Sequence, residues 1–237
     1  MKRLRDYAKI GSASVVRANL DDLASKLQQA GQLLLTQLDL GIGCCVYPEI
    51  ARSTAEQLQL LAKHIDEPIE ITAGICRTVF EINVVFRYCL SSTNRLGAYA
   101  DQSGTDEISI YKAIKALADK DTDPENIELL DQHINNIQSV LRKHGRSLKP
   151  ERQSLYQMAK EIGLKDEYES MYGVYSKYVH ASAWFVLRKR DQIDLPMYRL
   201  PMQLHTQLYA ADTLYRLEEL TSKTEEGGAG NDAPRCA

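Results

Sequence analysis

One helix that is apolar around most of its circumference constrains the fold of this chain more than any other feature. Residues 69–91 include the stretch "CRTVFEINVVFRYC" (residues 76–89), in which apolar side chains recur at helical spacing. Its main apolar stripe consists of Ile75, Val79, Ile82, Phe86 and Cys89. Further apolar side chains extend onto other faces, and such a helix has to be covered from several sides. The segment therefore predicts the central helix of a bundle.

Helical periodicity extends over most of the remaining sequence. The further helices that it predicts span residues 14–38, 48–66, 104–119, 124–143, 150–162, 165–188 and 202–221. Between the last two helices, the proline-bounded segment "DQIDLPMYRLP" (residues 191–201) is expected to be extended. No segment has the alternation of apolar and polar residues that is typical of a strand. The predicted fold class is therefore all-α, a multi-helix bundle.

A single helical domain is expected over residues 1–222. Its core would contain residues 14–100 and 165–221, with a charged helical excursion inserted at about residues 101–150. The remaining residues, 223–237, are rich in glycine and charged side chains and poor in apolar ones. A disordered C-terminal tail is therefore expected there.

Composition excludes several functional classes. The net charge of -3 does not suit a protein that coats nucleic acid nonspecifically, so a nucleic-acid contact would have to be a local patch. The five cysteines form no C-x-x-C pair, and we interpret them as reduced thiols of a cytoplasmic protein, with Cys76 and Cys89 in the core. No apolar run approaches the roughly 20 residues of a membrane span, and no membrane contact is expected. The N-terminal "MKRLRDYAKIG" lacks the apolar run of a signal peptide.

No metal ion or cofactor is expected. His64, His133, His144 and His205 have no carboxylate or cysteine partner at the spacing of metal ligands. The chain also lacks a glycine-rich phosphate loop and the motifs G-x-S-x-G and H-E-x-x-H. Any chemistry would therefore depend on other side chains.

The first stretch that can carry chemistry is the apolar helix itself. Arg77 and Glu81 are four residues apart and share one face, with Asn83 and Arg87 on a flank. On an ordinary amphipathic helix, such a pair is a surface ion pair that contributes a few tenths of a kcal/mol. On a central helix the pair is shielded from water, and a shielded pair is costly enough to indicate a site. Both interpretations remain open.

The second stretch is "YSKYVHASAWF" (residues 175–185), where a histidine lies in a segment expected to be a buried helix. Ser176 and Lys177 precede His180 by about one turn, and tyrosine hydroxyls lie nearby in the sequence. A lone helical histidine is usually a hydrogen-bonded core or boundary residue. The polar residues around His180 favour a functional site instead. The sequence does not decide between these two interpretations.

Two basic runs can contact phosphate groups. "RKRD" (residues 188–191) follows the histidine segment and would place positive charge near His180. "RKHGRSLKPER" (residues 142–152) lies between two predicted helices and is more typical of a solvated connection.

The two stretches together resemble a group of bacterial all-α proteins known as a domain of unknown function. The resemblance follows the pattern R-x-x-x-E and then, about a hundred residues later, Y-x-x-Y-x-x-x-x-H-x-S. The matching residues are Arg77, Glu81, Tyr172, Tyr175, Ser176, His180 and Ser182. The resemblance covers about residues 50–190. Those proteins are similar, more distantly, to the HEPN superfamily, and this resemblance implies a HEPN-like helical bundle.

Many HEPN proteins are metal-independent ribonucleases of toxin–antitoxin and phage-defence systems, so the resemblance implies RNA as substrate and an antitoxin as partner. Their usual signature is R-x(4–6)-H within one helix. This sequence departs from it, because the basic residue shortly before His180 is Lys177, at too short a spacing. Arg77 would have to replace the missing arginine. HEPN-like domains without the signature often bind partners without catalysis.

The sharpest hypothesis is metal-independent cleavage of RNA. His180 would be the general base for the 2′-hydroxyl, because a histidine titrates near neutral pH. Arg77 would stabilise the phosphorane, and Glu81 would hold Arg77 or orient His180. The candidate substrate-binding residues are Tyr175, Ser176, Lys177, Arg87 and Asn83.

Two other hypotheses remain open: a noncatalytic module that binds a partner protein or small ligand, and a dimerisation protein whose apolar helix faces form a homodimer. A nuclease requires His180, Arg77 and Glu81 to converge in a cleft flanked by basic residues. A noncatalytic module allows the same cluster to be tightly packed. The exposure of His180 to solvent distinguishes these two arrangements.

Overall fold

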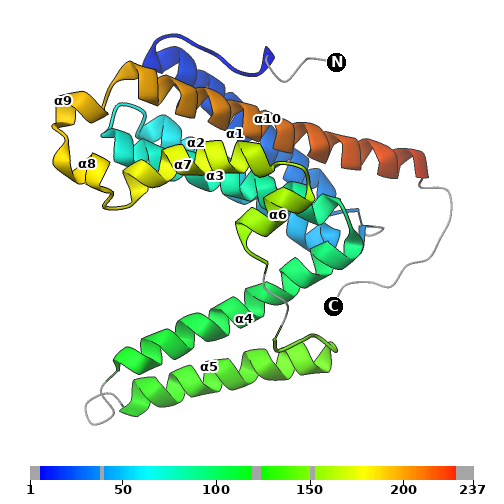
Figure 1. Ribbon diagram of the computed structural model, residues 1–237. Coiled ribbons are helices and arrows are strands. Elements are labelled where there is room, and N and C mark those ends of the chain that lie inside the picture. The colour runs from blue at the N-terminus through cyan, green and yellow to red at the C-terminus, as the bar shows by residue number, and fades with distance from the viewer. Residues whose placement is uncertain (1–5, 38–39, 119–123, 150–152, 228–237) are drawn as a thin grey trace. The chain divides into compact units, whose positions relative to one another are not determined.

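The computed structural model describes residues 6–37, 40–118, 124–149 and 153–227. This part of the chain is helical throughout its regular structure and contains no strand, so the predicted all-α class is confirmed. Its ten helices, seen in Figure 1, are α1 (Ala13–Leu34), α2 (Gly43–Lys63), α3 (Ile69–Leu90), α4 (Thr93–Leu117), α5 (Pro124–Lys143), α6 (Leu155–Glu161), α7 (Lys165–Val179), α8 (Ala183–Leu187), α9 (Arg190–Ile193) and α10 (Pro196–Gly227).

The helices form two compact units. The larger consists of Met1–Tyr88 and Leu155–Ala237, and the smaller of Cys89–Ser154. In the larger unit, α1 packs against α2 and α10, and α3 contacts both α7 and α10 (Figure 1). In the smaller unit, α4 and α5 form a helical hairpin that includes a 2.6 Å ion pair between Lys115 and Asp131. The expected single domain with an insertion stays a prediction.

The central position predicted for residues 69–91 is confirmed. Phe80 of α3 is fully buried. Its ring centroid lies 5.8 Å from that of Tyr168, 6.2 Å from that of Tyr175 and 5.0 Å from that of Tyr209. Since these tyrosines belong to α7 and α10, one aromatic cluster fixes three helices together, at about 0.5–1.5 kcal/mol per ring pair beyond simple burial.

The predicted burial of two cysteines is also confirmed. Cys76 is 0% and Cys89 1% exposed, and burial raises the pKa of each thiol to about 12. Because the thiolate is the reactive form, both side chains are inert at neutral pH.

Two helices begin earlier than predicted. α2 starts at Gly43, so Pro48 lies inside the helix, although a proline cannot donate a hydrogen bond there. Pro48 is buried against α1, where a Cβ atom added to Gly31 would lie 3.4 Å from the Pro48 carbonyl oxygen. α4 starts at Thr93 and not near residue 104, because the side chain of Ser92 caps it by accepting a 3.2 Å bond from the Asn94 backbone.

The prediction of an extended segment at residues 191–201 is wrong. Residues 190–193 form α9, and α10 begins at Pro196, a residue that suits the first position of a helix. Arg199 fixes this turn, because its guanidinium donates to both carboxylate oxygens of Asp194, at 2.6 and 2.7 Å. It also donates to the Ile65 carbonyl oxygen at 3.0 Å.

The predicted limits of two other segments also change. α6 is shorter than residues 150–162, of which 150–152 lie outside the described residues. α10 continues to Gly227, so residues 223–227, predicted as part of a disordered tail, are helical. The rest of that predicted tail, residues 228–237, lies outside the described residues.

The predicted continuous helix over residues 165–188 is wrong, and the break falls at the histidine. α7 ends at Val179, and His180 has an extended backbone with φ -110° and ψ 156°. Ser182 stabilises the break from both sides. Its hydroxyl donates to the Lys177 carbonyl oxygen at 2.9 Å and accepts from the Phe185 backbone N–H at 3.2 Å, which caps α8. The histidine therefore follows a helix and does not lie within one.

Among the described residues, no helix combines the length and the apolarity that crossing a membrane requires.

Candidate active site

Arg77 and His180 meet in the fold, although 103 residues separate them in the sequence. The Nη1 atom of Arg77 lies 3.2 Å from the Nε2 atom of His180. Arg77 projects from the middle of α3, and His180 follows the last residue of α7. The packing of α3 on α7 therefore joins the two residues that the sequence had singled out separately.

All three nitrogen atoms of the Arg77 guanidinium have a partner. Nε donates to Glu81 Oε1 at 2.7 Å, and Nη2 donates to the Tyr172 hydroxyl at 3.2 Å. The guanidinium carbon also lies 4.5 Å from the centroid of the Tyr172 ring, within the range of a cation–π interaction. An arginine carries five N–H groups, so these contacts with Glu81, Tyr172 and His180 fix its orientation without using every donor.

The ion pair is partly shielded from water. The Arg77 side chain is 19% exposed and that of Glu81 25%. Partial burial opposes the charge of Arg77, but the hydrogen bond and the negative charge of Glu81 prevail and raise the pKa of Arg77 above its ordinary value. Arg77 is thus a permanent cation at any physiological pH.

The permanent charge of Arg77 decides the tautomer of His180. A guanidinium only donates hydrogen bonds, so the Nε2 atom at 3.2 Å has to accept. The imidazole in this contact is therefore neutral, with its proton on Nδ1. A proton on Nε2 would place two donors against each other and break the contact.

His180 is exposed to solvent, in contrast to its predicted place in a buried helix. Its backbone N–H donates to the Ser176 carbonyl oxygen at 3.2 Å, which ends α7. The imidazole is thus held at the surface by a backbone contact on one side and by Arg77 on the other. Of the two arrangements considered, an accessible histidine beside a partly buried arginine is the one that a catalytic site needs.

Tyr172, not Tyr175, is the tyrosine of this site. Its ring stacks on that of Tyr168, with centroids 5.0 Å apart and an interplanar angle of 14°. Tyr168 packs against Phe80, so the core supports the ring on which Arg77 rests. Both tyrosines belong to the motif Y-x-x-Y-x-x-x-x-H-x-S, but the predicted substrate contact is Tyr175 and not Tyr172.

Tyr175 is a core residue. It is 0% exposed, and burial raises the pKa of its hydroxyl far above the ordinary value. A direct contact with a substrate is therefore incompatible with this structure. On a helix, residues three apart differ in direction by about 60°, which here suffices for Tyr172 to contact Arg77 while Tyr175 enters the core.

Asn83 points towards α10 and not towards His180. Asn83 is 1% exposed, and its amide lies 3.0 Å from Asp212 Oδ2 and 3.0 Å from Thr213 Oγ1. This predicted substrate contact instead belongs to the junction of α3 with α10. Arg87 is half-buried, and its predicted contact with a substrate stays a prediction.

Asn83→Ala is expected to lower the free energy of unfolding by about 1–3 kcal/mol, because Asp212 and Thr213 lose a buried donor. Chemical denaturation followed by circular dichroism measures this loss. Asn135→Ala, at an exposed position of α5, is the matched control and should leave the stability unchanged. A loss of activity in Asn83→Ala without a loss of stability would instead restore its predicted role in substrate binding.

Ser176 and Lys177 lie in the last turn of α7, shortly before His180. The Ser176 hydroxyl donates to the Gly173 carbonyl oxygen at 3.1 Å, within α7. Lys177 is exposed. An added Cβ atom at Gly173 would meet no atom within 4 Å, so open space lies beside this glycine.

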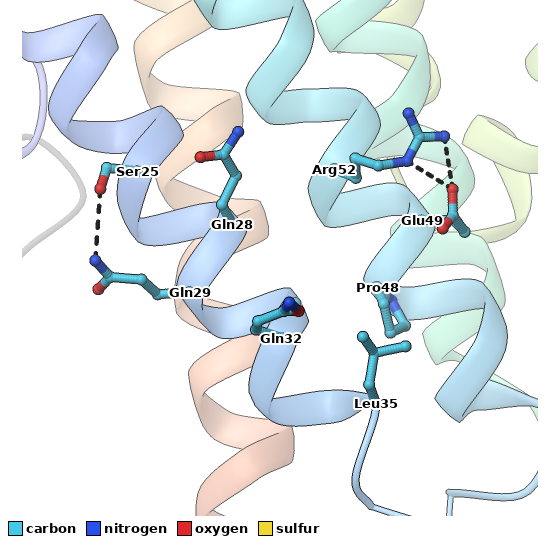
Figure 2. Close-up of a pocket in the computed structure, with 9 residues that line it drawn as sticks. Ser25, Gln28, Gln29, Gln32, Leu35, Pro48, Glu49 and Arg52 are labelled. Atoms are coloured by element: carbon cyan, nitrogen blue, oxygen red, sulfur yellow. Dashed lines mark hydrogen bonds and ion pairs between the residues drawn. The ribbon is translucent and has the colours of Figure 1, made fainter.

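A pocket of about 510 Å³ lies elsewhere in the larger unit, between α1 and α2. Figure 2 shows residues that line it, among them the polar side chains of Ser25, Gln28, Gln29, Gln32, Glu49 and Arg52. Arg52 donates to Glu49 at 2.6 Å and to Glu56 at 2.5 Å, so two carboxylates neutralise it. None of the predicted catalytic residues lines this pocket.

In the described part of the chain, no three His, Cys, Asp or Glu side chains are grouped so that they could hold a metal ion. The side chains that meet at the candidate site are those of Arg77, Glu81, Tyr172 and His180.

Comparison with models of protein families gives a match over much of the chain. The model of a family of unknown function (DUF5677) matches residues 44–192, which is more than half of the 237 residues. The matched range includes Arg77, Glu81, Tyr172 and His180. No curated protein and no solved structure is similar enough to match.

Proposed function

We propose that this chain, which belongs to the family of unknown function DUF5677, is a metal-independent endoribonuclease with a HEPN-like bundle, whose catalytic residues are Arg77 and His180. The observation that carries the proposal is the 3.2 Å contact between a permanently charged guanidinium and an exposed, neutral imidazole. A cation and a base at this distance can act on the same phosphodiester.

The proposed reaction starts when a phosphate of the RNA binds to Arg77. The phosphate oxygens accept hydrogen bonds from the N–H groups of Arg77. Because Arg77 then no longer bonds the Nε2 atom of His180, this atom is released to act as a base. Nε2 then takes the proton of the 2′-hydroxyl, and O2′ attacks phosphorus. The bond between phosphorus and O5′ breaks, and O5′ takes a proton from water. The products are a 2′,3′-cyclic phosphate and a 5′-hydroxyl, and His180 returns its proton to solvent.

Glu81 and Tyr172 have positioning roles in this proposal. The ion pair with Glu81 and the bond to the Tyr172 hydroxyl hold the guanidinium before any substrate arrives. Preorganised charge of this kind costs no rearrangement in the transition state, which is why it is effective in catalysis. Toxin–antitoxin or phage-defence function is the setting that the HEPN resemblance implies, with an antitoxin as a candidate partner.

A second function, noncatalytic binding, is supported by one specific observation. The guanidinium of Arg77 already bonds Glu81, His180 and Tyr172, as it would in a packed cluster that shapes a surface for a partner protein or small ligand. In this alternative, Arg77 and His180 shape the surface without acting on a phosphodiester.

The test is cleavage of a defined RNA by the full chain in EDTA, with analysis of the product ends. The proposal predicts 2′,3′-cyclic phosphate and 5′-hydroxyl ends, and no cleavage of DNA of the same sequence, because DNA lacks the 2′-hydroxyl. Intact RNA at high concentrations of a folded protein between pH 6 and 8 would rule out the nuclease and favour the noncatalytic module.

A further inference from the structure

Helix α8 leaves its apolar side chains uncovered. It consists of Ala183, Trp184, Phe185, Val186 and Leu187, and none of these residues is buried. Val186 is 60% and Leu187 82% exposed, and Met197 in the first turns of α10 is 67% exposed. A cluster of exposed apolar side chains next to a candidate site marks a binding surface more often than isolated exposed residues do.

Basic residues gather around α8 in the sequence. Residues 170–190 contain Lys177, Arg188, Lys189 and Arg190 and no aspartate or glutamate, although Asp191 follows directly. Arg190 is paired with Glu70 at 2.6 Å, but Lys177, Arg188 and Lys189 are exposed. The apolar surface of α8 therefore lies among positive charges.

One aromatic ring in this surface is held in place. The Trp184 ring lies nearly perpendicular to Tyr178 and Tyr198, with centroid distances of 5.2 and 5.9 Å. The guanidinium carbon of Arg188 lies 5.8 Å from the Trp184 ring. Trp184 is only partly buried. It follows His180 by four residues and Arg188 follows by eight, so the ring and the cation are close in the sequence to the proposed catalytic base.

We infer that this surface is a docking strip for single-stranded nucleic acid, formed by Lys177, Trp184, Leu187, Arg188 and Lys189. Bases would contact Trp184 and Leu187, while Lys177, Arg188 and Lys189 would contact phosphates. Proteins that bind single strands combine aromatic or apolar platforms with cations along the backbone in this way. A duplex conceals its bases and offers only its phosphates to such a strip.

The strip rests on the proposed function in one respect, since the strand that it holds would be the RNA cut at His180. An anionic membrane surface would meet the same charges. The strip continues directly from the exposed imidazole through the turn at Ser182, and this continuity favours a ligand that His180 can act on.

The chain contains a single tryptophan, so its fluorescence reports on Trp184 alone. The full chain is titrated with a single-stranded DNA of about 10 nucleotides, which the proposed reaction cannot cleave. Saturable quenching of the tryptophan emission is expected, and a duplex of the same sequence should quench much less. In a parallel experiment, the full chain is titrated with anionic lipid vesicles. Insertion of Trp184 into the lipid would shift its emission to shorter wavelengths.

The variant R188A/K189A removes two exposed cations of the strip without touching the core. Its affinity for the single strand should fall by about tenfold, and the slope of log affinity against log salt should decrease by about 1.4, or 0.7 per lost phosphate contact. R142A/K143A is the matched control, because it removes the same charges from the other basic run on α5. Its affinity and slope should equal those of the wild type.

Four outcomes would overturn the inference: no quenching by the single strand, equal binding of the duplex, a response to vesicles alone, or an equal loss of affinity in R142A/K143A. Failure of the nuclease proposal is distinguishable from these results. Quenching of Trp184 by the DNA without cleavage of RNA would rule out the nuclease and support the docking strip. Cleavage of RNA without quenching would rule out the docking strip and support the nuclease.

Discussion

His180→Ala is expected to lower the rate of RNA cleavage in EDTA by about two to four orders of magnitude, the usual contribution of a general base. The stability should change little. The His180 ring is exposed, and the bond from its backbone N–H to the Ser176 carbonyl oxygen does not depend on the side chain. Initial rates on a fluorescent RNA and a thermal denaturation curve measure the two effects.

His64→Ala is the matched control for this change. His64 also follows the last residue of a helix, α2, and its backbone N–H donates to the Leu60 carbonyl oxygen. Its cleavage rate should equal that of the wild type. An unchanged rate in His180→Ala would remove the imidazole from the mechanism.

Arg77→Lys is expected to lower the cleavage rate by about 10²–10³, as does the loss of one preorganised donor in other enzymes. A lysine keeps the charge beside Glu81 but has no planar fork. Its ammonium cannot bond Glu81, Tyr172 and His180 at the geometry of three separate nitrogen atoms. The stability should change less than in Arg77→Ala, which would leave the partly shielded Glu81 without its partner.

Arg52→Lys makes the same chemical change on α2, where Arg52 is paired with Glu49 and Glu56. This variant should cleave RNA at the wild-type rate. A fully active Arg77→Lys would show that positive charge alone is sufficient, and that the fixed orientation of the guanidinium has no catalytic value.

Periodicity predicted those parts of the site that depend on one helix. The central position of α3 follows from its apolar circumference, and the Arg77–Glu81 pair follows from a spacing of four residues. The sequence leaves open whether this pair is exposed or shielded, and the structure shows partial shielding, because a central helix leaves little of its surface in contact with water. These features require no knowledge of which helices are neighbours.

The features that depend on two helices could not be predicted in this way. Tyr172 contacts Arg77 and Tyr175 enters the core because one particular face of α7 packs against α3. The spacing of residues in the sequence does not tell which face this is. The end of α7 had a local signal in Ser182, a favoured capping residue. The apolar residues on both sides of Ser182 concealed it, because they continue the helical pattern across the break.

The most direct test of the central claim, that Arg77 and His180 form one catalytic site, is the cleavage rate of the double variant R77K/H180A in EDTA. Residues in contact usually show a coupling of about 0.5–3 kcal/mol. The double variant should therefore be faster, by roughly two- to a hundredfold, than the product of the two single effects predicts. A rate equal to that product would mean that the residues act independently. A folded wild type that leaves RNA intact would contradict the account altogether.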